Sequence, residues 1–176
     1  MKKKEINTKE GILFWITGLS GSGKTTIAKK IKKDIEKLYG PTLLVSGDDI
    51  RKIFDFKKYT AEERKTLVFK YCKFSKFITN QKINIIFAAV GMMDSVRDWL
   101  KKNILNYIEI YIKADLKKII KAKKKKIYHK KNIGDIVGVD IKPEFPKKPD
   151  IIIKNNFDKE IDILAKTLIK KIKTMI

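Results

Sequence analysis

Five short apolar runs recur along this chain of 176 residues, and longer amphipathic segments fill the intervals between them. The runs are mostly continuous and rich in β-branched residues, as strands covered on both faces should be. They span residues 12–17, 42–46, 83–90, 107–112 and 150–153. Helical periodicity occupies residues 24–38, 61–79, 95–103, 115–125 and 159 to the end. This alternation predicts an α/β fold with a doubly wound, parallel five-stranded sheet and helices on both faces.

Length and composition narrow the class further. A chain of 176 residues suits one domain, and 43% hydrophobic residues are enough for a full core. No run approaches the ~18 apolar residues that a membrane span requires, and the polar N-terminus lacks a signal-peptide core. Cys72 is the only cysteine, which excludes an internal disulfide and a cysteine-based metal site. We therefore expect a single domain, residues 1–176, in the cytoplasm, with no membrane partner.

The formal net charge of +22 raises the question of nucleic-acid binding. Nucleic-acid-binding proteins use arginine for bidentate phosphate contacts and interleave aromatic residues with their basic patches. Here lysine is spread over the whole chain, and only three of the 42 basic residues are arginines: Arg51, Arg64 and Arg97. We expect no specific nucleic-acid partner and keep a nucleotide-dependent nucleic-acid-binding protein as the alternative from another class. The rare arginines become candidates for anion recognition.

One segment interrupts the alternation. Residues 123–149 are rich in lysine, show no sustained period and contain two glycines and three prolines. A stretch of this length inside a compact domain is typical of a functional lid, and a buried strand resumes directly after it. The only histidine, His129, lies in this segment and is interpreted as a solvated side chain.

A phosphate-binding motif stands between the first predicted strand and the first predicted helix. Residues 18–25 read Gly-Leu-Ser-Gly-Ser-Gly-Lys-Thr and match G-x-x-x-x-G-K-[ST]. Small residues let the backbone turn its N–H groups toward an anion at the positive end of a helix. Lys24 is expected to reach the β- and γ-phosphates, and the Thr25 hydroxyl to hold Mg²⁺. The motif predicts a P-loop NTPase-type fold that binds ATP or GTP through Gly18, Ser20, Gly21, Ser22, Gly23, Lys24, Thr25 and Thr26.

Acidic and basic residues follow the second predicted strand, and the carboxyl ends of strands line the ligand crevice of a doubly wound sheet. Asp48 is predicted to face the transferring phosphate, where it either accepts the proton of an attacking hydroxyl, a catalytic role beside Lys24, or helps to order the magnesium shell. Asp49 is either a second functional carboxylate or a helix N-terminal residue whose negative charge interacts favourably with the helix dipole. Arg51 and Arg64 are predicted to grip the phosphate-like groups of an acceptor.

Several segments together resemble the adenylylsulfate kinase family. They are residues 14–17 before the loop, 47–51 and 60–64, and residues 137–140 and 143–150 are similar to that family's lid and its return to the last strand. The resemblance covers nearly the whole chain. It implies a kinase that moves the γ-phosphate of ATP onto the ribose 3′-hydroxyl of a nucleotide, usually adenosine 5′-phosphosulfate. It also implies a P-loop fold, Mg²⁺ and a homodimer.

Departures from the family's pattern gather on the acceptor side. Ser46 stands where members of the family carry an aspartate, and Leu67 where they carry an asparagine that contacts the acceptor. Ile136 stands where the family's lid carries an aromatic residue that stacks on the acceptor's adenine. Residues 91–95 replace the family's Ile-Ser-Pro-Tyr-Arg segment after the third strand. Arg97 is then the candidate to take the place of a nearby arginine of that family. The donor side is kept and the acceptor side differs.

These departures favour a similarly shaped acceptor with a different base. Losing an aromatic stacking partner removes ~1–3 kcal/mol, so several losses cut specificity by orders of magnitude. The sequence is similar to the adenylylsulfate-kinase-like enzymes of capsule phosphoramidate synthesis, which act on cytidine 5′-diphosphoramidate. Adenosine 5′-phosphosulfate is the alternative acceptor, and an uncharged small molecule is a further one. Met92 lines the acceptor pocket or packs in the core, and Phe56 or Tyr59 covers the base. The predicted acceptor contacts are Ser46, Arg51, Tyr59, Arg64, Met92 and Ile136.

Overall fold

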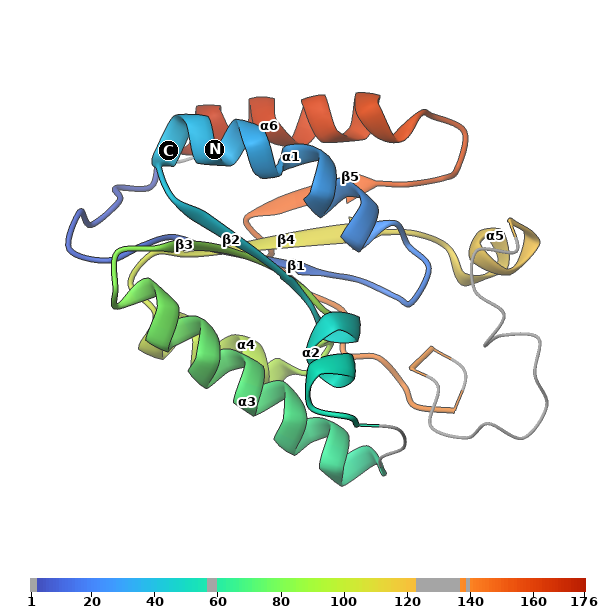
Figure 1. Cartoon of the computed structure of the whole chain (residues 1–176). Helices are drawn as coiled ribbons and strands as arrows, with labels where there is room; N and C mark the ends of the chain where they lie inside the picture. The colour runs from blue at the N-terminus through green and yellow to red at the C-terminus, as the bar shows by residue number, and fades with distance from the viewer. Residues whose placement is uncertain (1–2, 57–59, 123–136, 139) are drawn as a thin grey trace.

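The computed structural model describes residues 3–56, 60–122, 137–138 and 140–176. Five strands of these residues form one sheet in the order β2-β3-β1-β4-β5, and all neighbouring strands are parallel (Figure 1). The predicted doubly wound, parallel five-stranded sheet is confirmed. The strands are β1 (Leu13–Thr17), β2 (Thr42–Ser46), β3 (Asn84–Ala88), β4 (Tyr107–Lys113) and β5 (Ile151–Lys154).

Helices cover both faces of the sheet, with α1 and α6 on one face and α3 and α4 on the other (Figure 1). The helix α2 has seven residues and directly follows β2; apart from the possible helix start at Asp49, it was not among the predicted helices. It is too short to show the apolar repeat that identifies a longer helix. The helices of the described residues are α1 (Lys24–Tyr39), α2 (Gly47–Ile53), α3 (Ala61–Thr79), α4 (Asp94–Asn103), α5 (Leu116–Lys121) and α6 (Ile161–Met175).

The central strand β1 is buried on both faces because its alternate side chains enter two cores. Phe14 and Ile16 pack with α1 and α6, whereas Leu13 and Trp15 pack with α3 and α4. The connections from β1 and β3 depart to opposite sides at this point of the sheet, and a crevice opens at the carboxyl ends of the strands. The fold thus places the phosphate-binding motif, which follows β1, in the crevice.

The predicted lid is described only in part. Residues 123–136 and 139 lie outside the described residues, and with them His129. Val137 and Ile141 form an isolated β-bridge, and the segment from there to β5 is irregular, as expected. Among the helices that the structure describes, none is both long and apolar enough to cross a membrane.

Candidate active site

The phosphate-binding motif forms the turn between β1 and α1. Gly23 precedes α1 with a φ of 95°, in the left-handed region that strains other residues. A Cβ at this position would lie 2.9 Å from Nδ2 of Asn155, so there is also no room for a side chain. No side chain caps α1. The first N–H groups of the helix therefore lack a side-chain acceptor, and an anion is their natural partner.

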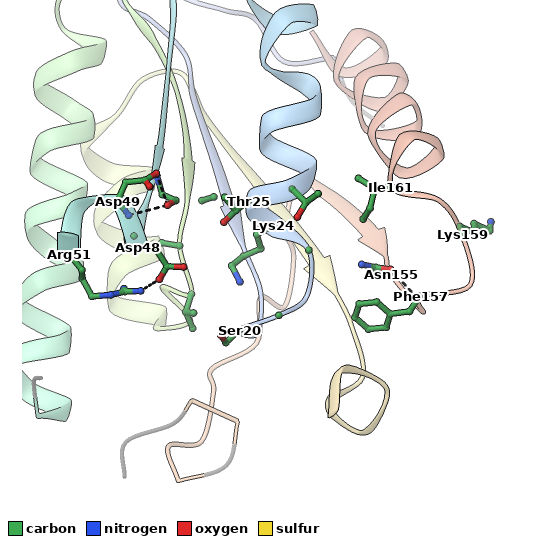
Figure 2. Close-up of a pocket in the computed structure, with 18 residues that line it drawn as sticks. Ser20, Lys24, Thr25, Asp48, Asp49, Arg51, Asn155, Phe157, Lys159 and Ile161 are labelled. Carbon is green, nitrogen blue, oxygen red and sulfur yellow. Dashed lines mark hydrogen bonds and ion pairs between the residues drawn. The ribbon is translucent and has the colours of Figure 1, made fainter. Parts of the chain in front are cut away.

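Lys24 and Thr25 begin α1 and lie in the crevice. The Lys24 side chain is buried, and its Nζ donates a hydrogen bond of 2.7 Å to the carbonyl oxygen of Leu19 in the loop. This bond folds the ammonium group back over the loop. Figure 2 shows Lys24 and Thr25 between the wall that carries Asp48 and the wall that carries Asn155. The positive charge predicted for a bound phosphate is therefore in the middle of the site.

One wall of the site begins with the cap of α2. Ser46 is the N-cap residue, and its Oγ accepts a hydrogen bond from the Asp49 N–H at 3.2 Å and donates one to Oδ2 of Asp49 at 2.7 Å. The Asp49 carboxylate also accepts from the Ser46 N–H at 3.1 Å, which completes a capping box. The helix-terminal interpretation of Asp49 is confirmed. Ser46 lines the cavity, but its hydroxyl serves the cap.

Asp48 and Arg51 lie one turn apart on α2 and form an ion pair. Their side chains are partly exposed and both line the crevice, where Asp48 is directed toward the Lys24 side (Figure 2). The pair presents a carboxylate, a proton acceptor, and a guanidinium, a bidentate anion-binding group, at the same end of the crevice.

The opposite wall is the turn between β5 and α6, which the sequence analysis missed. Asn155 is buried, donates from Nδ2 to the carbonyl oxygen of Ser22 at 3.0 Å, and accepts at Oδ1 from the Phe157 N–H at 3.0 Å. It therefore ties this turn to the phosphate-binding loop. Phe157 adopts a φ of 63° and lines the cavity. The signal that could have found this turn is the pair Asn155 and Asn156 directly after the last strand. The same reasoning, that the carboxyl ends of the strands line the crevice, had drawn attention to residues 46–51.

These elements enclose a cavity of about 550 Å³, within the range of nucleotide and cofactor sites. The phosphate-binding loop lies in its middle, with Asp48 and Arg51 at one end and Phe157 at the other (Figure 2). Gly18 and Ser22 lie in the same loop but are buried beneath its surface. The predicted ATP contacts that line the cavity are Ser20, Gly21, Gly23, Lys24, Thr25 and Thr26.

A second cavity, of about 250 Å³, shares Ser20, Arg51, Ala89 and Val90 with the first. The predicted acceptor contacts Arg51, Arg64 and Met92 lie together in its wall, so the structure brings three distant segments of the chain to one place. The other side chains are mainly apolar, with two charged groups. The remaining lining residues are Leu67, Val68, Tyr71, Gly91, Met93, Val137, Ile141, Lys142 and Glu144.

Other residues were also candidates for contact with the acceptor. Tyr59 and Ile136 are outside the described residues. Phe56 is half-exposed, stands against Phe54, and has Nζ of Lys70 5.8 Å above its ring. The stand-in role of Arg97 is wrong, because its side chain lies under α4 between Asp94 and Glu109. The periodicity of α4 turns Arg97 toward the sheet together with Val96 and Leu100.

Comparison with known proteins identifies the family. The family model of adenylylsulphate kinase matches residues 10–154. A cytidine diphosphoramidate kinase of Campylobacter jejuni is 32% identical over 163 residues, which are 89% of this chain and 95% of that protein. The chain belongs to the adenylylsulphate kinase family. An adenylyl-sulfate kinase of Clostridium kluyveri is 29% identical over 161 residues, 89% of this chain and 81% of that protein.

Solved structures agree with this adenylylsulphate kinase fold. The APS kinase CysC of Mycobacterium tuberculosis, in complex with AMPPNP and APS, superposes with a TM-score of 0.79 at 22% identity and covers 93% of this chain and 98% of its own. The crystal structure of APE1195 gives a TM-score of 0.81 at 24% identity, with 94% and 97% covered. As a member of the adenylylsulphate kinase family, the chain is an ATP-dependent phosphotransferase, and the crevice around Lys24 is its candidate active site.

Proposed function

We propose that this kinase transfers the γ-phosphate of ATP to the ribose 3′-hydroxyl of a nucleotide, and that the nucleotide is cytidine 5′-diphosphoramidate. The observation that carries the proposal is the pair of cavities that share Ser20 and Arg51. One is built around the phosphate-binding loop and the other around two arginines. Phosphoryl transfer depends chiefly on positioning and on charge neutralisation, and two adjoining anion sites supply both.

The larger cavity is the proposed donor site. The loop amides and Lys24 would hold the β- and γ-phosphates, and the Phe157 ring would cover the nucleoside end, because it lies across the loop from Asp48. The Thr25 hydroxyl fits Mg²⁺, which prefers oxygen ligands and is commonly held by one or two protein oxygens together with substrate phosphates. When bound, the ion would neutralise charge on the transferring phosphate.

The smaller cavity is the proposed acceptor site. Arg51 and Arg64 would bind the two charged groups on the acceptor's 5′ side, since guanidinium groups match phosphate oxygens in a bidentate manner. Asp48 pairs with Arg51 in the free protein, so an anionic acceptor competes with this carboxylate for the guanidinium. Asp48 is then released to accept the proton of the attacking hydroxyl.

The choice of acceptor rests on the relatives and on the cavity wall. The Campylobacter jejuni relative is named for cytidine diphosphoramidate, whereas the Clostridium kluyveri relative is named for adenylyl sulfate. Leu67 and Met92 lie in the described wall beside Arg64. Adenosine 5′-phosphosulfate is accordingly the second candidate, and the preference for cytidine 5′-diphosphoramidate rests on the more similar relative and on Leu67, which stands where the sequence comparison expects an asparagine that contacts the acceptor.

The deciding experiment is an ADP-release assay with ATP, Mg²⁺ and a panel of acceptors: cytidine 5′-diphosphoramidate, adenosine 5′-phosphosulfate, CDP and UDP. Phosphorus NMR then locates the new phosphate, and Lys24→Ala protein controls for contaminating kinases. We expect cytidine 5′-diphosphoramidate to give the highest kcat/KM and a 3′-phosphate. A strong preference for adenosine 5′-phosphosulfate would establish the alternative.

We also propose that residues 1–176 form one catalytic domain that assembles as a homodimer, which light scattering tests.

A further inference from the structure

Arg97 is a buried arginine between two carboxylates from different elements. Its Nη2 pairs with Asp94 at the start of α4, and its Nε lies 3.7 Å from Oε1 of Glu109 on β4. The Arg97 and Glu109 side chains are only 5% and 1% exposed. Burying an ion pair costs desolvation that the mutual attraction seldom exceeds, so the pair is not explained by stability alone.

The surroundings of the pair are also not optimised for stability. Nη1 of Arg97, Oε1 of Glu109, the Tyr107 hydroxyl and Nε1 of Trp15 are buried without a hydrogen-bond partner among the described residues. Such groups are rare in folded proteins, and each needs a reason. Burial raises the pKa of the Glu109 carboxyl, and the neighbouring Arg97 opposes that rise.

Asp94 connects the buried pair to the second cavity. The Asp94 N–H donates to the Glu144 carboxylate, and the Glu144 N–H donates to the carbonyl oxygen of Met92 at 3.1 Å. Both Met92 and Glu144 line the cavity. Two segments far apart in sequence, around residues 92–94 and 144, are therefore joined by two hydrogen bonds at the N-terminal end of α4, where Arg97 pairs with Asp94.

The floor of the same cavity rests on the sheet next to Glu109. A Cβ on Gly91 would lie 2.8 Å from the Trp15 ring, so the backbone at Gly91 is in direct contact with that ring. Trp15 is the partner of Glu109 in the pairing of β1 with β4. A shift of the layer that holds Glu109 and Arg97 is transmitted to the cavity wall because the interior is close-packed.

We propose that Arg97 is a positioning residue for the acceptor. Held by Glu109, it fixes Asp94, and Asp94 docks Glu144 against Met92, so that one wall of the acceptor cavity keeps its shape. The assignment of this cavity to the acceptor rests on the proposed function, whereas the chain of contacts from Glu109 to Glu144 does not.

The kinetic test compares Arg97→Lys and Asp94→Asn with Asp98→Asn, an exposed position on the same helix. Lysine keeps the charge but cannot span two carboxylates as a guanidinium does, and Asp94→Asn removes the charge at the exposed end of the pair. We expect both variants to raise the acceptor KM roughly tenfold while the ATP KM stays within about twofold of wild type. The Asp98→Asn control should match wild type. Equal rises in both KM values, or no rise, would overturn the proposal.

A second readout does not depend on the acceptor's identity. Hydrogen–deuterium exchange of Asp94→Asn and Arg97→Lys should be faster in peptides that cover residues 91–94 and 143–146, and unchanged in residues 18–25. If those two peptides exchange as in wild type, or if the phosphate-binding loop loosens equally, Arg97 is only a structural residue. A protein that phosphorylates no nucleotide of the panel yet shows the selective exchange would disprove the proposed function and leave the positioning role standing.

Discussion

Lys24 and Asp48 reach the same cavity from two elements, the first turn of α1 and the first turn of α2. One supplies a positive charge that is buried against the loop, and the other a carboxylate that is open to the acceptor side. Their chemistry predicts different consequences when each is removed. In the proposed mechanism, removing Lys24 deprives the γ-phosphate of its nearest cation, whereas removing the Asp48 carboxylate leaves substrate binding in place and deprives the proton of its acceptor.

We expect Asp48→Asn to lower kcat by about 100-fold or more and to change the ATP KM by less than about threefold, because a carboxamide keeps the shape but not the basicity. Lys24→Ala should abolish measurable turnover. Steady-state rates with both substrates varied give the two constants. Asp34→Asn, exposed on α1, is the matched control. Near-full turnover of the Asp48 variant would refute its role as the base.

A separate prediction concerns Arg51 and Arg64, the two arginines of the proposed acceptor cavity. Arg51→Lys and Arg64→Lys should each raise the acceptor KM about tenfold or more, because an ammonium group cannot replace a bidentate guanidinium contact with an oxyanion. ATP binding, measured by calorimetry without acceptor, should change little. If affinity for ATP falls as much as affinity for the acceptor, these arginines belong to the donor site.

The short helix α2 shows what one element contributes. It carries Asp48 and Arg51, yet it has only seven residues and depends on its capping box for a defined start. An isolated helix of this length does not form in water, so its cap and the packing of Ile50 in the core must hold it. The orientation of Asp48 toward the crevice follows from both.

Removing the cap should therefore be measurable as a loss of stability. We expect Ser46→Ala to lower the free energy of unfolding by about 1 kcal/mol, since the Asp49 N–H loses its acceptor, and Ser46→Thr to lose less. Urea denaturation should show a lower midpoint with an unchanged slope. An alanine variant as stable as wild type would mean that the Asp49 carboxylate caps the helix alone.

At the scale of the whole molecule, Cys72 reports on the opening of the core. It is fully buried on α3 against β1 and β3, and burial raises the pKa of its thiol to about 12. Because the thiolate is the reactive form, the folded protein offers neither access nor an ionised sulfur at pH 8. The single thiol thus responds only to unfolding of the core between the sheet and α3.

We expect Ellman's reagent at pH 8 to leave the native protein unlabelled over minutes and to modify it at once in urea. The fraction labelled across a urea series should follow the loss of helical circular dichroism, as one cooperative transition requires. Cys72→Ser protein provides the zero of the assay. Rapid labelling without denaturant would show that α3 opens independently of the sheet.

Much of the fold followed from local patterns in the sequence. The predicted bounds of β2 and α3 are those of the structure, Thr42–Ser46 and Ala61–Thr79, because apolar periodicity and capping are properties of short segments. The phosphate-binding motif needed only its own residues and the strand and helix beside it. In each of these cases, one periodic segment or one motif is enough to predict the local structure.

What only the tertiary structure decided is which segments meet. Asn155 joins the phosphate-binding loop because parallel strands β5 and β1 end at the same edge of the sheet; the polar pair after β5 marks the residue, but no local pattern marks its partner. Arg97, singled out by its rarity, turned out to face Glu109, since the rotation of α4 against the sheet sets its direction. The sequence by itself determined the strands, the longer helices and the phosphate-binding motif. The proposed acceptor cavity depended on strand order and helix rotation, which are set by contacts between residues far apart in the chain.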